Sequence, residues 1–325
     1  MHELQQKLAR LFKVTAAEIS LEPLQAGLTH KSYCCRIANQ RYFVKVYRPV
    51  HHMAVPVQRI NQLTEYMCGQ GIPASRVILY SPEFANIVVH EFVEGEMHSG
   101  AYSQIAAIAG LYSRLALLGM ECSQILSKPI YLSGINDVLT QIRSFENSAV
   151  TVEASIHAGM LALAETVLAA LQAGIPDTGL LHIFVHDDFS EKNILLQGDQ
   201  VKLLCDWDSY RLKLLNEHLA STAARFSTER PLMGELRQDK LSCFLQSLQP
   251  ELLKHIPDPG GYATLFPYWA TLKHLRTYIF RNSLVQLNRM DLKPSLLEWP
   301  LQHCNWLIDN KHIVSDWVYR SLKPG

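Results

Sequence analysis

The residues most able to do chemistry lie between positions 186 and 208. His186, Asp188 and Asn193 form the pattern His-x-Asp-x4-Asn, and Asp206 and Asp208 follow in Asp-Trp-Asp. Apolar runs flank these residues, so a strand, a loop and a hairpin should bring Asp188, Asn193 and Asp206 to the ends of neighbouring buried strands. Oxygen ligands at one rim suit Mg²⁺, which takes one or two protein oxygens and completes its shell with phosphates.

The same spacing is found in the phosphoryl-transfer loop of kinases. The strings HDDFSEKNILL and LLCDWD resemble the catalytic motif of the aminoglycoside phosphotransferase and choline kinase superfamily. Many members have Gly where this chain has Asp187, whereas choline kinase-like members also lack that Gly. The resemblance implies an α+β, two-lobed protein-kinase-like fold. A small N-terminal lobe would hold an antiparallel five-stranded sheet and a helix, and a larger C-terminal lobe would be mostly helical.

The resemblance also implies a role for each motif residue in phosphoryl transfer that uses ATP and Mg²⁺. Asp188 would orient the acceptor hydroxyl and accept its proton. Asn193 and Asp206 would hold the metal ion across the β- and γ-phosphates. His186 would brace the loop by hydrogen bonding, and Asp208 would orient the metal ligands.

Lys45 stands in an expected strand, Tyr42–Tyr47, whose alternation directs its side chain to the face opposite the valines. Burying an amine costs free energy unless it meets an anion, and the ATP α- and β-phosphates are that anion in kinase-like folds. The alternative is a lysine on a solvated sheet face. Glu65, in an expected helix over Val57–Cys68, is the candidate ion-pair partner of Lys45, and a solvated helix acid is an equal alternative.

Two further segments are expected to contact ATP. The string GLTHKSY resembles the Gly-Leu-Thr-Asn segment of choline and thiamine kinase-like members, with His30 in place of Asn. Gly27 would allow close backbone approach, and Thr29 would donate to phosphate oxygens. The string EFVEG resembles the family's hinge, which implies that backbone groups of Glu91 and Val93 bind the adenine edge.

The resemblance of EFVEG to the family's hinge implies a boundary between lobes near Gly95, giving lobes 1–95 and 96–325. An amphipathic helix over the first 13 residues should pack on the sheet. The other expected strands of the sheet are 19–25, 32–37, 77–80 and 86–92. From Ala101 the chain is expected to be helical, with further helices over 135–145, 156–173, 209–226, 236–248, 262–290 and 296–322.

Composition indicates a cytoplasmic enzyme. Thirty basic and thirty acidic residues balance, which disfavours nucleic-acid binding. Seven cysteines, an odd number without CxxC pairing, are typical of free thiols in a reducing compartment. The first residues are charged, and no run reaches about 18 apolar residues, so neither a signal peptide nor a membrane span is expected. The oligomeric state is not fixed by the sequence.

The expected partner is a small-molecule hydroxyl acceptor, preferably a cationic alcohol of the choline, ethanolamine or thiamine type. Aromatic residues between positions 262 and 278 offer cation–π contacts, and Glu217 stands where family members often carry an acid that lines the acceptor pocket. The alternatives are an aminoglycoside, homoserine or sugar kinase of this fold, or a nucleotide-binding pseudokinase scaffold. A protein kinase is disfavoured, because Asp-Phe-Gly and Ala-Pro-Glu motifs are missing.

Overall fold

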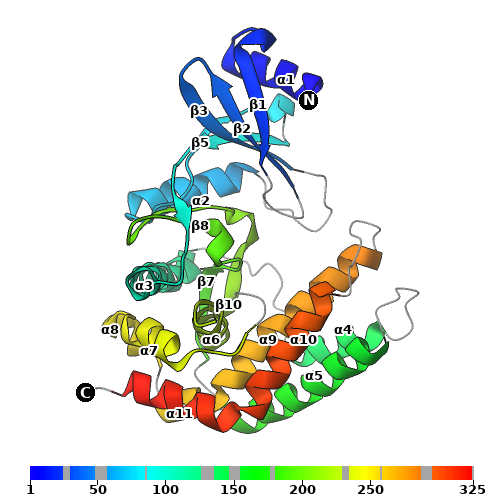
Figure 1. Cartoon of the computed structure of the whole chain (residues 1–325), viewed down its shortest axis with the longest axis vertical. Coiled ribbons are helices and arrows are strands. Elements are labelled where there is room, and N and C mark those ends of the chain that lie inside the picture. Colours follow the sequence, from blue (N-terminus) through cyan, green and yellow to red (C-terminus); the bar gives the residue numbers. More distant parts are fainter. Residues whose placement is uncertain are drawn as a thin grey trace. The chain divides into compact units, whose positions relative to one another are not determined.

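The computed structural model describes residues 1–24, 30–47, 57–84, 86–125, 135–145, 154–175, 180–228, 234–256, 258–286 and 295–323. The chain divides into two compact units, Met1–Met97 with Lys192–Ser209, and His98–Glu191 with Tyr210–Gly325. The first contains a five-stranded antiparallel sheet and the second is mostly helical (Figure 1), which confirms the kinase-like α+β fold. The first segment of the first unit ends at Met97, and the expected lobe boundary near Gly95 stays a prediction. However, Lys192–Ser209, expected in the C-terminal lobe, belong to the first unit.

The sheet of the first unit has the strand order β1-β2-β3-β5-β4. In β3, Val44 pairs with Val89 and faces the same side, whereas Lys45 pairs with Val88 and faces the other side. This agrees with the alternation expected from the sequence. The strands are β1 Ile19–Leu24, β2 Lys31–Ile37, β3 Gln40–Val46, β4 Val77–Tyr80 and β5 Ile87–Glu91.

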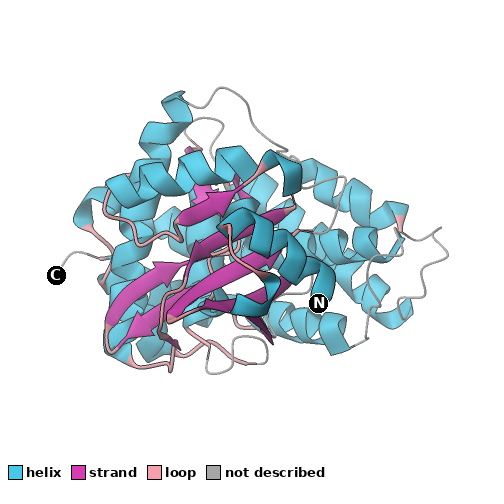
Figure 2. Ribbon diagram, turned by 90° about the horizontal axis from the view of Figure 1, so that it is seen from above, coloured by secondary structure: helices cyan, strands magenta, loops and turns pink. Residues whose placement is uncertain are grey.

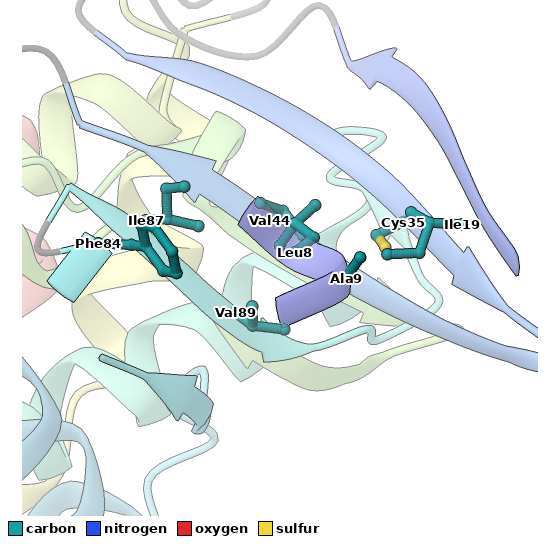
Figure 3. Packing of buried hydrophobic residues seen from close by; sticks show 8 residues of the cluster. All are labelled: Leu8, Ala9, Ile19, Cys35, Val44, Phe84, Ile87 and Val89. Carbon is teal, nitrogen blue, oxygen red and sulfur yellow. The ribbon is translucent and has the colours of Figure 1, made fainter. Parts of the chain in front are cut away.

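The amphipathic helix α1 (His2–Phe12) covers one face of this sheet (Figure 3). Leu8 is fully buried against Val44 and Val89, among others. Burying a leucine side chain stabilises a fold by about 1.5–3 kcal/mol. Thr15 and Glu18 form a capping box just after the helix. The opposite face of the sheet is therefore left to carry Lys45.

A small second sheet in the first unit positions the Asp-Trp-Asp segment. It consists of β6 (Glu96–Met97), β8 (Ile194–Gln197) and β9 (Gln200–Leu204). Gly198 forms the turn of the hairpin with φ +58°, a value that favours glycine. At the end of β9, the Leu204 amide donates to the Pro73 carbonyl at 2.6 Å, in the loop after α2 (Val57–Gly69). The hairpin is thus fixed to the remainder of the first unit.

In the second unit, β7 (His182–His186) pairs with β10 (Tyr210–Leu214), and α6 (Leu215–Phe226) follows. The single helix expected over Ser209–Phe226 is therefore wrong in its first part. Tyr210–Leu214 alternate in polarity and hydrogen-bond to β7, and such a short run is ambiguous between strand and helix in a sequence.

Helices make up most of the second unit (Figure 1), and Figure 2 shows the helices of the chain in cyan. The long helix α9 contacts α5, α6, α10 and α11, and its Trp269 is fully buried. It begins at Pro259 because proline is tolerated at the first helical position. The helix expected over 296–322 is divided at Asn310. The remaining helices are α3 Tyr102–Ile125, α4 Ile135–Ser144, α5 Ala154–Gly174, α7 Gln238–Gln246, α8 Pro250–Leu253, α9 Pro259–Gln286, α10 Ser295–Asp309 and α11 Lys311–Leu322.

Two of these helices, α3 and α5, contain stretches long and apolar enough to cross a membrane: Tyr102–Cys122 and Ala154–Gly174. In the structure, α3 packs against β7 and α7, and α5 packs against α9 and α4. Ile108 and Leu111 of α3 and Leu171 of α5 are buried in these contacts. We interpret both as core helices. The expectation that the chain has no membrane span is not tested by these contacts and stays a prediction.

Candidate functional site

Lys45 is the centre of a charged cluster in the first unit. Its Nζ lies 2.8 Å from Asp208 Oδ2 and also hydrogen-bonds to Asp206 Oδ1. The Lys45 side chain is only 9% exposed. Burial by itself would lower the pKa of Lys45, but the phenol of Tyr47 and the two carboxylates outweigh this effect and raise that pKa. The lysine is therefore a fixed, buried cation held by two carboxylates, and its expected contact with the ATP phosphates stays a prediction.

Asp208 is the more buried of the two acids. His30 Nε2 lies 3.3 Å from its Oδ2, and both side chains are almost fully buried. The ring of His30 also contacts the ring of Tyr47, with centroids 4.7 Å apart. Burial would raise the pKa of Asp208, but the hydrogen bond from His30 and the charge of Lys45 outweigh it and hold that pKa below its usual range. Asp208 is therefore a carboxylate that positions Lys45.

Asp206 and Asn193 are the expected metal ligands. The Cys205 amide donates to the Asn193 carbonyl at 2.9 Å, which joins the start of β8 to the residue before Asp206. The Asp206 side chain is 36% exposed, and its φ of +70° is strained for a residue with a Cβ. Burial and the nearby Asp208 raise the pKa of Asp206 to about 6, against the opposing charge of Lys45.

This donor set fits Mg²⁺ bound together with phosphates. Within the part of the chain that the structure describes, no group of three or more His, Cys, Asp or Glu side chains could hold a metal ion unaided. Asp206 would contribute a partly exposed carboxylate and Asn193 an amide oxygen. Mg²⁺ commonly takes only one or two carboxylates from the protein and its other ligands from water and substrate phosphates.

Only some of the residues expected to contact the nucleotide lie in the described part of the chain. Glu91 and Val93 line a pocket of about 540 Å³ within the first unit, together with Arg76 and Lys202. Glu91 ends β5, and its amide donates to the Arg76 carbonyl at 3.1 Å. The adenine-binding role of this segment stays a prediction. Gly27 and Thr29, expected to contact phosphates, lie outside the described residues.

Glu65 is not the ion-pair partner of Lys45 in this structure. Its side chain is exposed on α2, whereas Ile60, Leu63 and Met67 on the same helix are buried. The two aspartates after β9 take the place expected for Glu65. The solvated-acid alternative describes this residue.

In the second unit, Asp188 is exposed on the loop after β7. The Phe189 amide donates to the His186 carbonyl at 3.0 Å, and that carbonyl lies 3.3 Å from His218 Nε2. Tyr112 Oη lies 3.2 Å from His218 Nδ1. Burial lowers the pKa of His218 to about 3, so its ring is neutral. A neutral ring has one N–H, so Nε2 donates to the carbonyl and Nδ1 accepts from the phenol.

His186 itself is buried, as a bracing residue should be. In the structure, His218 hydrogen-bonds to the His186 carbonyl, and Tyr112 hydrogen-bonds to His218 in turn. The sequence placed His218 only beside an expected pocket acid. A lone histidine in a helix gives no sequence pattern that predicts its contact with the loop after β7.

Asp187 is the centre of a second charged cluster. Its carboxylate lies 2.9 Å from Lys213 Nζ, 2.9 Å from Lys273 Nζ and 3.1 Å from Arg211 Nε. Burial would raise the pKa of Asp187, but the three cations outweigh it and hold that pKa well below its usual range. These basic residues were missed in the sequence. Arg211 and Lys213, two apart in β10, point to one side of a strand that was expected to be helical.

Glu217 was expected to line the acceptor pocket. Its side chain is only 2% exposed, and its Oε1 lies 2.9 Å from Arg276 Nε and 3.5 Å from Lys213 Nζ. Two cations therefore already neutralise this carboxylate. Its role toward a substrate stays a prediction.

A sequence model of the phosphotransferase enzyme family matches residues 20–242, more than half of the chain. None of the curated proteins matches the sequence. Among solved structures, the choline kinase of Cryptosporidium parvum is similar in fold, with a TM-score of 0.64 at 12% identity over 97% of this chain and 96% of that one. The choline kinase of Streptococcus pneumoniae has a TM-score of 0.60 at 16% identity, over 94% and 98%. A spectinomycin phosphotransferase, solved with ADP and spectinomycin, has a TM-score of 0.63 at 15% identity, over 98% and 97%.

Proposed function

Because the chain belongs to the phosphotransferase enzyme family, we propose that it transfers the γ-phosphoryl group of ATP to a hydroxyl of a small molecule. The observation that carries this proposal is the buried ammonium of Lys45 beside Asp206 and Asp208. A fixed cation next to partly exposed oxygen ligands suits the phosphates of a nucleotide and their metal ion. The similar spectinomycin phosphotransferase was solved with ADP, which supports ATP as the donor.

In this reaction the acceptor oxygen attacks the γ-phosphorus, and the bond between that phosphorus and the β,γ-bridging oxygen breaks. The hydroxyl proton passes to Asp188, and ADP leaves with the electron pair of the broken bond. Bound Mg²⁺ would offset the negative charge on the phosphates. Lys45 would bind and orient the α- and β-phosphates, and Asn193 and Asp206 would hold the metal ion.

The presence of Lys45, Asp188, Asn193 and Asp206 favours an active enzyme over a pseudokinase scaffold. Asp188 is accessible to solvent, and the loop that carries it is held by buried hydrogen bonds at the His186 carbonyl. In the sequence, Asp188 and Asn193 keep the spacing of the motif, with four residues between them. A cationic alcohol stays one candidate acceptor, but Glu217, the acid assigned to its charge, already has two cationic partners.

Two measurements test this proposal. Calorimetry of ATP with and without Mg²⁺ should show binding that the metal ion tightens. Transfer of the labelled γ-phosphate should then be screened over choline, ethanolamine, thiamine, homoserine, sugars and aminoglycosides, with Asp188→Asn as the control. ATP binding without transfer to any hydroxyl compound would favour the scaffold alternative, and lack of ATP binding would remove the proposal.

A further inference from the structure

The second unit concentrates positive charge beside Asp188. We define the basic cluster as Arg211 and Lys213 of β10 together with Lys273 and Arg276 of α9. Three of these side chains contact the carboxylate of Asp187, the residue directly before Asp188. Lys273 Nζ also donates to the Asp187 carbonyl at 2.8 Å. The cluster is therefore attached to the backbone of the catalytic loop.

Among the residues that the structure describes, the carboxylates in ion-pair contact with the basic cluster are those of Asp187 and Glu217, two acids for four cations. Four cations face Asp187 and Glu217, and a positive excess persists when Asp188 is counted as a third anion. An uncompensated charge in a partly buried setting is unfavourable, and an anion bound there is attracted more strongly than it would be in water.

The ion pair between Glu191 and Arg225, in the same unit, shows how one cation neutralises one carboxylate. Glu191 meets a single cation, Arg225, whose Nε and a terminal guanidinium nitrogen lie 2.6 and 2.9 Å from the two carboxylate oxygens. This bidentate pair is balanced one to one. Asp187 has three cations where one would suffice, so neutralising Asp187 does not account for the basic cluster.

The side chains of the basic cluster differ in their exposed fraction, from nearly buried to partly exposed. The Lys213 side chain is 9% exposed, whereas that of Lys273 is 26% and that of Arg211 is 40% exposed. Lys213 is therefore the interior partner of Asp187 and Glu217. Arg211 and Lys273 present N–H donors that a solute can reach. Burial lowers the pKa of Lys273, and the neighbouring Lys213 and Arg211 add to this effect against the attraction of Asp187.

We propose that the phosphate acceptor carries an anionic group, a carboxylate or a phosphate, which binds Arg211 and Lys273 while its hydroxyl meets Asp188. This inference rests on the proposed phosphotransferase function and names the substrate class. An alcohol whose only charge is positive is disfavoured, because it would approach a site of its own sign. A guanidinium and an ammonium together suit either anion, since arginine binds both in a bidentate manner.

The test uses alcohols in matched pairs that differ in charge. Ribose and ribose 5-phosphate form the phosphate arm, and glycerol and glycerate form the carboxylate arm, with choline as the cationic member. Phosphate transfer from ATP and binding by calorimetry are measured for the wild type, Arg211→Gln, Lys273→Gln and Lys254→Gln. Lys254 is the control because its side chain is 73% exposed, in the same unit. The first two variants leave Asp187 two cations each, so the fold is expected to persist.

The expected result is that an anionic member is bound and phosphorylated in preference to its uncharged counterpart. Arg211→Gln and Lys273→Gln should each raise the KM of that anionic acceptor about tenfold, the effect of losing a hydrogen bond to a charged group. The KM of the uncharged counterpart should not change, and Lys254→Gln should match the wild type. A purely structural role would instead lower the unfolding temperature and leave the preference between charged and uncharged members intact.

Failure of this inference is distinguishable from failure of the proposed function. If the wild type phosphorylates choline or uncharged alcohols but binds neither anionic member, the anionic acceptor is overturned and the phosphotransferase stands. The anionic acceptor is also overturned if the wild type binds the charged and the uncharged alcohol of each matched pair with equal affinity. If Mg²⁺ and ATP do not bind at all, the proposed function fails in a separate measurement.

Discussion

The Nζ of Lys45 lies 2.8 Å from Oδ2 of Asp208, a contact between β3 and the segment after β9. The lysine expected to bind phosphates is thus held by the acids of Asp-Trp-Asp, and Glu65 on α2 is exposed. Both residues belong to the first unit, so its sheet and its hairpin together form the site around Lys45. A nucleotide would share this cation with the two carboxylates.

The first prediction separates Lys45 from Glu65. Lys45→Met should weaken ATP binding about tenfold or more, because it removes a buried cation that donates hydrogen bonds to anions. Glu65→Gln should bind ATP like the wild type, since the Glu65 side chain is exposed. Calorimetry with ATP measures both. A loss in Glu65→Gln equal to that in Lys45→Met would restore Glu65 to the nucleotide site.

The second prediction concerns the metal ion. Asp206→Ala should abolish the Mg²⁺-dependent tightening of ATP binding, because it removes the charged ligand assigned to the metal. Asp199→Ala is the matched control, since Asp199 is exposed at the turn of the same hairpin. Titrations of ATP with and without Mg²⁺ provide the comparison. An unchanged metal effect in Asp206→Ala would remove Asp206 from the metal site.

The third prediction concerns the base. Asp188→Asn should reduce turnover by roughly 10²-fold or more, the typical contribution of a positioned base, and leave ATP binding unchanged. The side chain is exposed, so its replacement should not disturb packing. Steady-state rates and nucleotide titrations of the variant check both parts. Wild-type turnover in Asp188→Asn would exclude it as the base.

The fourth prediction is acid destabilisation through buried histidines. Burial lowers the pKa of His218 to about 3 and that of His90 to about 4, from an ordinary value of 6.5. The unfolded chain therefore binds protons below pH 6.5 that the folded protein does not. Stability from these residues is complete above pH 6.5 and falls as pH drops toward 4, by about 1.4 kcal/mol per pH unit for each histidine.

Urea unfolding at pH 7, 6 and 5 measures this loss of stability. His218→Gln keeps a side-chain hydrogen-bond donor but does not titrate, so its free energy of unfolding should decline less steeply with acid than that of the wild type. Equal slopes in the two proteins would show that His218 is not a neutral buried ring in the folded state.

The sequence predicted the fold well because the patterns that indicate its strands and first helix are local. Alternation in Tyr42–Tyr47 correctly placed Lys45 opposite the α1 core, and the periodicity of the first helix predicted its packing on the sheet. The partner of Lys45 was not local. The choice between Glu65 and the acids of Asp-Trp-Asp depends on how the β8–β9 hairpin packs, which no periodicity records.

The basic cluster could not be predicted from the sequence for the same reason. Tyr210–Leu214 is too short for periodicity to separate strand from helix, so the shared direction of Arg211 and Lys213 was hidden. Lys273 and Arg276 come from α9, far along the chain, and only tertiary packing brings them to Asp187 and Glu217.

Transfer of a phosphoryl group from ATP to an alcohol can be measured in one experiment. The wild type is incubated with Mg²⁺, γ-labelled ATP and the panel of cationic, uncharged and anionic alcohols, and ADP and labelled products are quantified together. We expect one labelled phosphate ester for each ADP formed with at least one alcohol. ADP accompanied only by inorganic phosphate with every alcohol, or no ATP consumption at all, would contradict it.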